Sequence, residues 1–342
     1  MESIQELLRK LCKCIVKSDD GYKINIELEK SDPEPGPDPE PGPDPEIDPN
    51  SPEAKFDPNI PLFIENAQDI PISFCMACRS ESVNNRNISY SYDNITWQPL
   101  IFTKESSTDP YMSDNIILYR KGDRAYFKGE AADGLVSGTI DPARFTYGRG
   151  GIPSHCCVDV GGNITSMFYG KDDKFKTDYL DLSNITHTSS KSMIGTLFGE
   201  SNSRGLHSYI RIPPALPATT LCPDCYDAFF YWDTDLVDSP RLEYIPVLPA
   251  KKLEVDCYRY MFYSESYLSV TDKKDKFYCF KILAENAQGF SYIARDMKYI
   301  QVNNPNIISS LSIYKYGIIY CPIDPGSKLP AGWKWIKVPP ME

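Results

Sequence analysis

The sequence predicts a mixed α+β protein built from five consecutive parts: an N-terminal anchor helix, a proline-rich linker, a small antiparallel β-sandwich, a short repeat solenoid and a C-terminal cap. Three observations lead to this prediction. Apolar residues near the N-terminus recur with a helical period. The hexapeptide DPEPGP occurs twice in succession at 32–43. In the second half, a longer motif recurs at an offset of 32 residues.

The N-terminal helix is predicted over residues 2–17. Its apolar side chains recur at i, i+3, i+4, i+7 and i+11 and form one stripe, which consists of Ile4, Leu7, Leu8, Leu11 and Ile15. Because so short a helix is marginal alone in water, the stripe must be buried against something. The candidates are another copy of the chain, a host assembly or the protein's own body. We expect an anchor and oligomerisation segment.

The linker that follows has proline at nearly every second position and seven acidic residues between positions 32 and 48. Proline fixes φ and removes hydrogen-bond donors, so an extended polyproline II rod or a disordered linker is expected. Either structure separates the helix from the rest of the chain.

The stretch ISYSYDNITW, 88–97, alternates like a half-buried strand, with Ile88, Tyr90 and Tyr92 on one face. Two further strands are expected around 116–119 and 125–128, with a turn at 121–123. Short strands at this spacing predict the sandwich.

The repeat is visible when PALPATTLCPDCYDAFFYWDTDL, 214–236, is compared with PVLPAKKLEVDCYRYMFYSESYL, 246–268. Weaker copies place Leu197-Phe198 before it and Phe290 after it. Each unit is expected to form an extended LPA segment and then a short helix around Cys-Tyr-x-x-x-Phe. Such a unit buries its apolar face only by stacking on its neighbours.

These motifs resemble those of the BspA-like leucine-rich repeat proteins of Bacteroidales and of the phages that infect them. LPATTL followed by CY and FF or MF is similar to the family's repeat core. VGGNITSMFYG, 160–170, is similar to its lead-in, and GIIYCPIDPGSKLPAGWKWIKV, 317–338, to its closing cap. The Tyr-Ser-x-Asp-x-x-x-Trp stretch is similar to a β-module that often precedes the repeats. The resemblance covers roughly 58–342 and implies a leucine-rich solenoid used in surface display and adhesion.

The expected domain boundaries follow from these parts. They are the N-terminal segment 1–30, the linker 31–57, the sandwich 58–158, the repeats 159–300 and the cap 301–342.

Composition excludes two classes of partner. The net charge of −11 comes largely from the linker, and no basic stripe is present, so we expect no nucleic-acid binding. No stretch approaches 18 apolar residues, so no membrane insertion is expected. Charges interrupt the apolar residues of the N-terminus, and we expect no secretory signal there.

Catalytic and metal chemistry finds little support. Cys75–Cys78 and Cys222–Cys225 are spaced like zinc ligands, but they lie in different predicted modules. His155 precedes two cysteines on a predicted strand lead-in, where neighbouring side chains point to opposite faces. No pair of carboxylates stands out as a glycosidase pair. We therefore expect no catalytic residues, no metal and no cofactor, and eleven mostly buried thiols.

Aromatic residues in the repeats are the better functional signal, although packing also explains many of them. Exposed rings on a solenoid would suit sugar stacking or protein contact. The predicted contact residues are Tyr231, Trp232 and Tyr263.

Together, the layout and the resemblance predict a non-enzymatic phage virion protein, a head or tail fibre or decoration protein. Its N-terminus would bind capsid or tail proteins, and its C-terminal body would contact a host-surface glycan or protein. A homo-oligomer is expected; fibres are commonly trimeric, although so short a stripe fixes no number. The alternatives are a bacterial cell-surface adhesin and, third, a glycan-active hydrolase.

Overall fold

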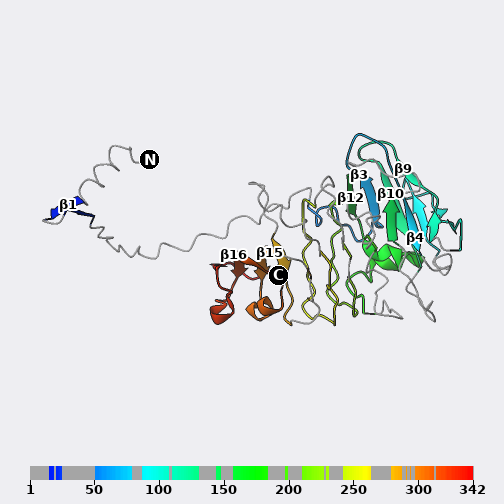
Figure 1. The fold of residues 1–342 in the computed structure, drawn as a ribbon. Helices are drawn as coiled ribbons and strands as arrows, with labels where there is room; N and C mark the ends of the chain where they lie inside the picture. Colours follow the sequence, from blue (N-terminus) through cyan, green and yellow to red (C-terminus); the bar gives the residue numbers. More distant parts are fainter. Residues whose placement is uncertain are drawn as a thin grey trace. The chain divides into compact units, whose positions relative to one another are not determined.

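The fold is known from a computed structural model. It describes residues 15–18, 21–24, 51–78, 87–107, 110–130, 144–147, 157–183, 197–198, 210–226, 229–230, 242–262, 279–286, 290, 293, 297–311 and 313–341. The chain divides into two compact units, 1–46 and 47–342. Regular structure in the described residues is mostly β (Figure 1).

The first unit contains an antiparallel hairpin of β1 (Ile15–Ser18) and β2 (Gly21–Ile24), with Ile15 opposite Ile24. The prediction of a helix up to residue 17 is therefore wrong at its C-terminal end. The β-branched pair Ile15-Val16 favours a strand. The other stripe residues, Ile4, Leu7, Leu8 and Leu11, lie outside the described residues.

The second unit begins with two β-sheets. One has the order β13-β12-β3-β10-β5-β6, and the other has the order β11-β4-β8-β7 with β9 also paired to β4. The strand bounds are β3 Phe63–Asn66, β4 Ile72–Cys78, β5 Ser89–Ser91, β6 Gln98–Pro99, β7 Phe102–Thr103, β8 Tyr111–Ser113, β9 Ile116–Leu118, β10 Arg124–Lys128, β11 Arg144–Tyr147, β12 Val158–Gly161 and β13 Ile210–Ile212.

Buried side chains join the two sheets. Phe74 on β4 and Phe127 on β10 are both fully buried, with ring centroids 6.2 Å apart. The strands expected around 116–119 and 125–128 are confirmed as β9 and β10. Gly122 in the turn between them has φ of +87°, a conformation that favours glycine.

The first sheet extends beyond the predicted sandwich. The expected boundary at residue 158 falls inside β12, and β13 joins the same sheet parallel to β12. After β12 the chain enters the 3-10 helices η2 (Ile164–Met167) and η3 (Lys171–Lys176). The buried Asn163 side chain caps η2 by accepting from the Thr165 N–H, and it donates to the carbonyls of Pro58 and Phe175.

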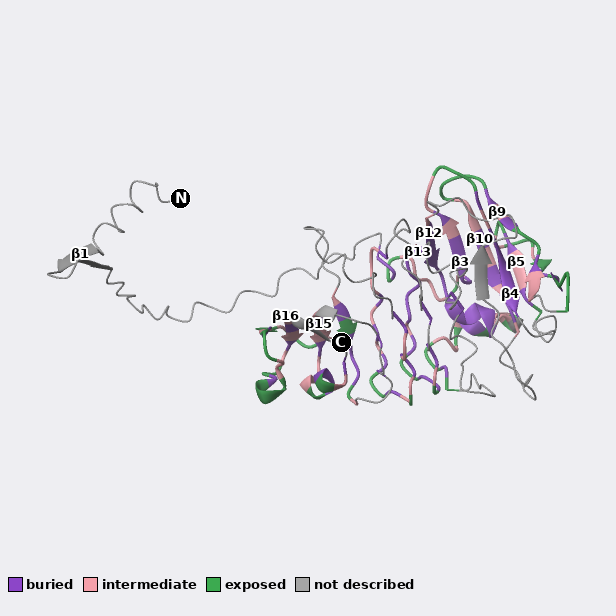
Figure 2. Cartoon of the chain, viewed as in Figure 1, coloured by how far each residue is buried: buried purple, intermediate pink, exposed green. Residues whose placement is uncertain are grey.

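Aromatic side chains that lie 32 residues apart stack on one another. Phe230 stacks on Phe198 and Phe262, with centroids 6.1 and 5.2 Å away and ring planes within 20°. Tyr258 likewise stacks between Tyr226 and Phe290, at 5.8 and 5.9 Å. The predicted equivalence of positions 32 apart is therefore confirmed for these residues. Figure 2 shows buried residues recurring along these segments.

Backbone hydrogen bonds follow the same register. Tyr226 N–H donates to the Cys257 carbonyl, at 2.7 Å, and Phe230 N–H to that of Met261, at 2.9 Å. Thr220 forms parallel bridges to Asp181 and to Lys252. Each segment thus forms its main-chain bonds with the next segment rather than within itself.

The short helix predicted around Cys-Tyr-x-x-x-Phe is wrong. Residues 223–226 and 255–260 form turns, in which Asp224, Asp256 and Tyr260 have φ between +51° and +54°. A left-handed residue interrupts a right-handed helix, and the N–H groups that a helix would use bond to the neighbouring segment instead.

The C-terminal strands continue the parallel arrangement, in the order β14 (Phe280–Ile282), β15 (Met297–Val302), β16 (Ile313–Cys321) and β17 (Trp333–Lys337). The 3-10 helices η6 (Pro305–Ser310) and η7 (Gly326–Lys328) lie between successive strands. The predicted start of the cap, at residue 301, falls inside β15. Asn303 closes the end by bonding the Met341 N–H and carbonyl.

The stacked rings generate a stability prediction. Phe230→Ala should lower the free energy of unfolding by about 3–5 kcal/mol, because it removes a buried ring packed between two others. Val255→Ala, at a side chain that is 57% exposed, should change it by less than about 0.5 kcal/mol. Chemical denaturation of both variants measures this, and equal effects would contradict the stack.

Candidate functional site

The predicted contact residues Tyr231, Trp232 and Tyr263 lie outside the described residues. Their described neighbours Phe230 and Phe262 are buried in the stack and serve packing.

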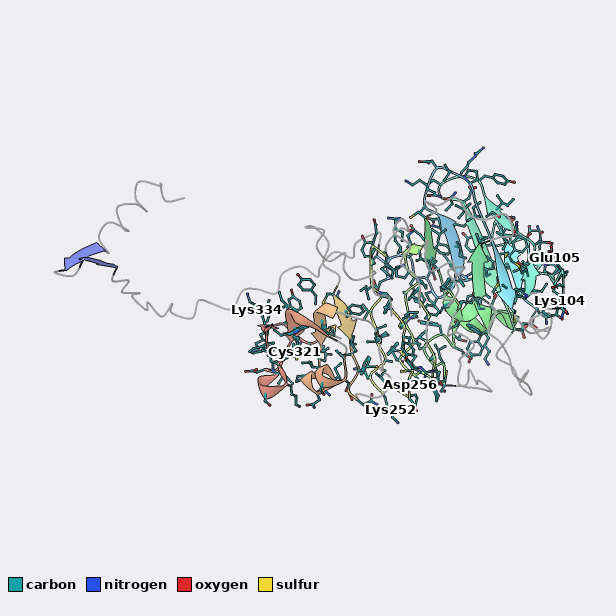
Figure 3. The ribbon with its side chains drawn as sticks, viewed as in Figure 1. Lys104, Glu105, Lys252, Asp256, Cys321 and Lys334 are labelled. Carbon is teal, nitrogen blue, oxygen red and sulfur yellow. The ribbon has the colours of Figure 1, made fainter. Side chains whose placement is uncertain are left out.

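Trp333 and Trp335, near the C-terminus, also pack inward. Trp333 is buried, and the half-buried Trp335 donates its indole N–H to the Cys321 carbonyl at 3.0 Å. Cys321 lies on the same parallel sheet as Lys334 (Figure 3).

Exposed aromatic rings occur on the sandwich instead. Tyr92 is 47% exposed and Tyr119 is 64% exposed, and both belong to residues that directly follow a strand, β5 and β9 respectively. Tyr90 packs edge-on against Tyr92, with centroids 5.5 Å apart at 88°. Burial raises the pKa of Tyr92, and the nearby phenols of Tyr90 and Tyr119 add to this increase. We call these three residues the tyrosine rim, because they join the edge of one sheet to the edge of the other.

A turn held by its own backbone borders the tyrosine rim. The Asp93 carboxylate accepts hydrogen bonds from the N–H groups of Ile95, at 2.8 Å, and Thr96, at 2.7 Å. Those two bonds, with a further one from Ser91, hold the pKa of Asp93 well below its usual range. Asn94 has φ of +59°, which Asn tolerates better than most residues. The turn presents Ile95, which is 82% exposed.

Trp97, the last aromatic residue of the same stretch, is covered by a cation. Lys128 Nζ lies 4.7 Å from its ring centroid and forms an ion pair with Asp173 at 2.7 Å. Hydrogen bonds from Lys128 and then Lys176 lower the pKa of Asp173. This tryptophan therefore belongs to the packing of the sheet's outer face rather than to the tyrosine rim.

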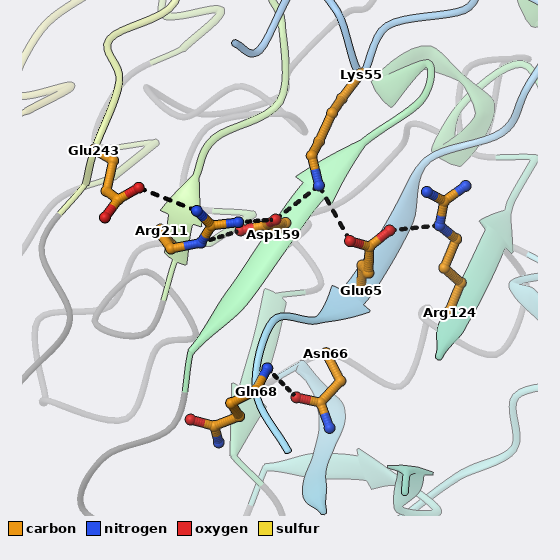
Figure 4. A network of polar contacts seen from close by, with 8 residues as sticks. All are labelled: Lys55, Glu65, Asn66, Gln68, Arg124, Asp159, Arg211 and Glu243. Atoms are coloured by element: carbon orange, nitrogen blue, oxygen red, sulfur yellow. Dashed lines mark hydrogen bonds and ion pairs between the residues drawn. The ribbon is translucent and has the colours of Figure 1, made fainter. Parts of the chain in front are cut away.

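A second feature is a row of charges across the first sheet (Figure 4). Arg124, Glu65, Asp159 and Arg211 lie on the adjacent strands β10, β3, β12 and β13. Asp159 is directly opposite Glu65, and like charges in such a cross-strand pair repel.

Lys55 offsets that repulsion. Its Nζ lies 2.7 Å from Asp159 Oδ2 and 3.1 Å from Glu65 Oε1. Arg211 binds Asp159 through two nitrogens, at 2.9 and 2.5 Å, and Arg124 binds Glu65 at 2.6 Å. The Asp159 side chain is only 1% exposed, so each of its charge contacts is shielded from water.

The charge row joins three parts of the second unit. Lys55 belongs to residues 51–57, which were predicted as linker but lie on the body, with Ser51 and Pro52 buried. The Gly162 N–H donates to the Lys55 carbonyl at 2.9 Å. At the other end, Arg211 Nη1 lies 3.0 Å from Glu243 Oε2. We call residues 51–60 the entry segment.

The cysteines of the repeats lie in the interior. Cys222, Cys225 and Cys257 are buried, and the Cys222 and Cys225 side chains are hydrogen-bonded to each other. Burial raises the pKa of the Cys225 and Cys257 thiols well above the usual range, and it raises the pKa of Cys279 to about 11. A protonated thiol is a poor nucleophile and a poor metal ligand.

The other predicted cysteine pair, Cys75 and Cys78, is buried in β4, and His155 lies outside the described residues. Across the described ranges, no group of three or more His, Cys, Asp or Glu is arranged to hold a metal ion. In the same ranges, no helix has both the length and the apolar character needed to cross a membrane.

Comparisons with protein-family models, with curated proteins and with solved structures find no match to this chain.

Sequence analysis missed the charge row, although a signal for it exists. Asp159 and Arg211 each stand alone between two β-branched residues, in Val-Asp-Val and Ile-Arg-Ile. A charge in the middle of a short apolar strand needs a partner. It also assigned Tyr92 to the buried face, because alternation does not show where a strand ends.

The charge row predicts that Lys55→Met lowers the free energy of unfolding by about 3 kcal/mol, because two facing carboxylates lose the cation between them. Hydrogen exchange should increase first in the entry segment. Lys104→Met is the matched control, since Lys104 lies over the Tyr111 ring at an exposed position (Figure 3), and it should cost less than about 1 kcal/mol. Equal costs for the two variants, with no local change in exchange, would disprove the role of Lys55.

The buried thiols predict weakening at alkaline pH. A thiol with a raised pKa in the fold ionises only in the unfolded chain between its ordinary pKa, near 9, and its folded value, about 11 for Cys279. Stability is therefore fully present below pH 9 and falls as pH rises above it, by about 1.4 kcal/mol per pH unit for each such thiol. Urea denaturation at pH 8, 9 and 10 tests this, with Cys257→Ala expected to reduce the slope. A midpoint that does not change over this range would contradict the prediction.

Proposed function

We propose that this chain is a non-enzymatic virion protein of a phage of Bacteroidales, a head or tail fibre or decoration protein. In this proposal residues 1–30 hold the chain on the particle by binding capsid or tail proteins. The linker separates this anchor from the body, and the body contacts the host surface or its glycans. The protein would be assembled in the host cytoplasm and exposed on the particle.

The observation that carries the proposal is the division of the chain into two compact units on either side of the proline-rich, acidic segment. Proline and mutual repulsion of the acids favour an extended linker. Where this linker meets the body, the entry segment is held by the Lys55 ion pairs and by a hydrogen bond from the Val247 N–H to Glu53. A chain that is anchored at one end and displayed at the other needs such a fixed attachment.

The finer description of the body, a short BspA-like leucine-rich repeat solenoid with a cap, belongs to this proposal. It is supported by the sequence resemblance, by the stacking of residues 32 apart and by the alternation of parallel strands with 3-10 helices from β15 to β17. The family resemblance in turn supports a role in adhesion.

The anchor generates a prediction for a culture that makes the protein natively. Tagged full-length protein should co-purify with phage particles in a density gradient, whereas a tagged chain lacking residues 1–30 should remain soluble at the top of the gradient. Immunoblotting of the fractions measures this, and an unchanged thermal unfolding curve shows that the deletion leaves the body folded.

Two results would count against the proposal. Equal recovery of the deletion variant on particles would remove residues 1–30 as the anchor. Full-length protein in the cell-envelope fraction, with none on particles, would favour the alternative of a bacterial surface adhesin.

A further inference from the structure

We infer that the tyrosine rim (Tyr90, Tyr92 and Tyr119) is a saccharide-binding site on the sandwich, separate from the contact residues predicted in the repeats. This inference rests on the proposed function in one respect only, that the body meets a surface coated with glycans. The site itself is argued from the geometry of the rim.

The rings are exposed but held in place. The Tyr92 hydroxyl accepts a hydrogen bond from the Ile117 N–H at 3.4 Å, and its ring packs edge-on against Tyr90. Tyr90 in turn donates its hydroxyl to Gln98 Oε1 at 3.2 Å. An exposed ring that is already ordered loses little entropy when it binds a ligand.

The backbone around the rim is ordered in the same way. Asp93 closes the turn that follows Tyr92, and the Asp123 carboxylate accepts from the N–H groups of Tyr119, at 2.9 Å, and Arg120, at 2.8 Å. Each acid near the rim is thus engaged by main-chain donors, which reduces its repulsion of oxygen-rich ligands. Arg120 and Lys121 are exposed directly after Tyr119 and supply hydrogen-bond donors.

This combination fits a sugar ring better than a protein partner. The C–H face of a pyranose packs on an aromatic ring, while its hydroxyl groups bond to polar side chains beside that ring, and tyrosine offers both an apolar surface and a polar end. A stable protein interface buries about 800 Å² on each partner around a central apolar cluster. The exposed apolar residues that border the rim in the described chain amount to Ile95. We therefore assign a saccharide chain as the ligand.

The test uses the full-length chain on a printed array of neutral and acidic oligosaccharides. The double variant Tyr92→Ala/Tyr119→Ala should weaken binding to the best saccharides about tenfold or more. Tyr92→Phe/Tyr119→Phe keeps the ring faces and should retain most of the binding. Ile323→Ala, at an exposed apolar residue of the C-terminal part, is the matched control and should bind like the unchanged chain. Thermal unfolding of each variant excludes loss of the fold as the cause.

Each outcome decides the assignment. Binding that the alanine pair loses and the phenylalanine pair keeps supports the site. No binding to any saccharide, or binding that the alanine pair leaves unchanged, overturns it. The alanine pair should still co-purify with particles. Failure of saccharide binding with intact particle association would therefore reject the rim alone, and failure of particle association would reject the proposed function alone.

Discussion

The position of Lys55 between Glu65 and Asp159 is the interaction on which the body's first sheet depends. Two carboxylates on neighbouring strands face each other there, and one of them is almost completely buried. Without a cation between them, the pairing of β3 with β12 would carry an uncompensated repulsion. The cation comes from residues just after the linker, so the entry segment must be docked before this sheet is electrically balanced. Arg211 extends the same row to Glu243, which precedes the second stacked segment.

The repeats depend on a different constraint, the register of 32 residues. Stacked rings and parallel backbone bonds require that equivalent positions of successive segments meet, whatever lies between them. The segment from 231 to 241 can therefore differ in sequence from 263 to 273 without shifting Phe262 from Phe230. Left-handed turns at Asp224 and Asp256 occur at equivalent positions and direct the N–H groups toward the neighbouring segment. The array is thus held by contacts between neighbours, as expected for stacked repeats.

Local patterns predicted the local structure well. The turn at Gly122, the strands beside it and the equivalence of Phe230 with Phe262 all follow from sequence, because each depends on nearby residues or on a strict repeat. The helix expected after Cys225 failed because Cys-Tyr-x-x-x-Phe has helical spacing, whereas the main-chain partners lie in another segment. The charge row brings together residues from 55 to 243, and no single sequence motif contains it. Exposure of the tyrosine rim depends on where β5 and β9 end, which alternation does not reveal.

The central claim is that this body is displayed on a phage particle. Immunogold electron microscopy with an antibody against residues 51–342, applied to a culture that makes the protein natively, tests it most directly. The account predicts gold on phage particles, at the head or the tail, at the place where the anchor holds the chain. Gold on the cell envelope beside unlabelled particles would contradict the account and make the protein a bacterial adhesin.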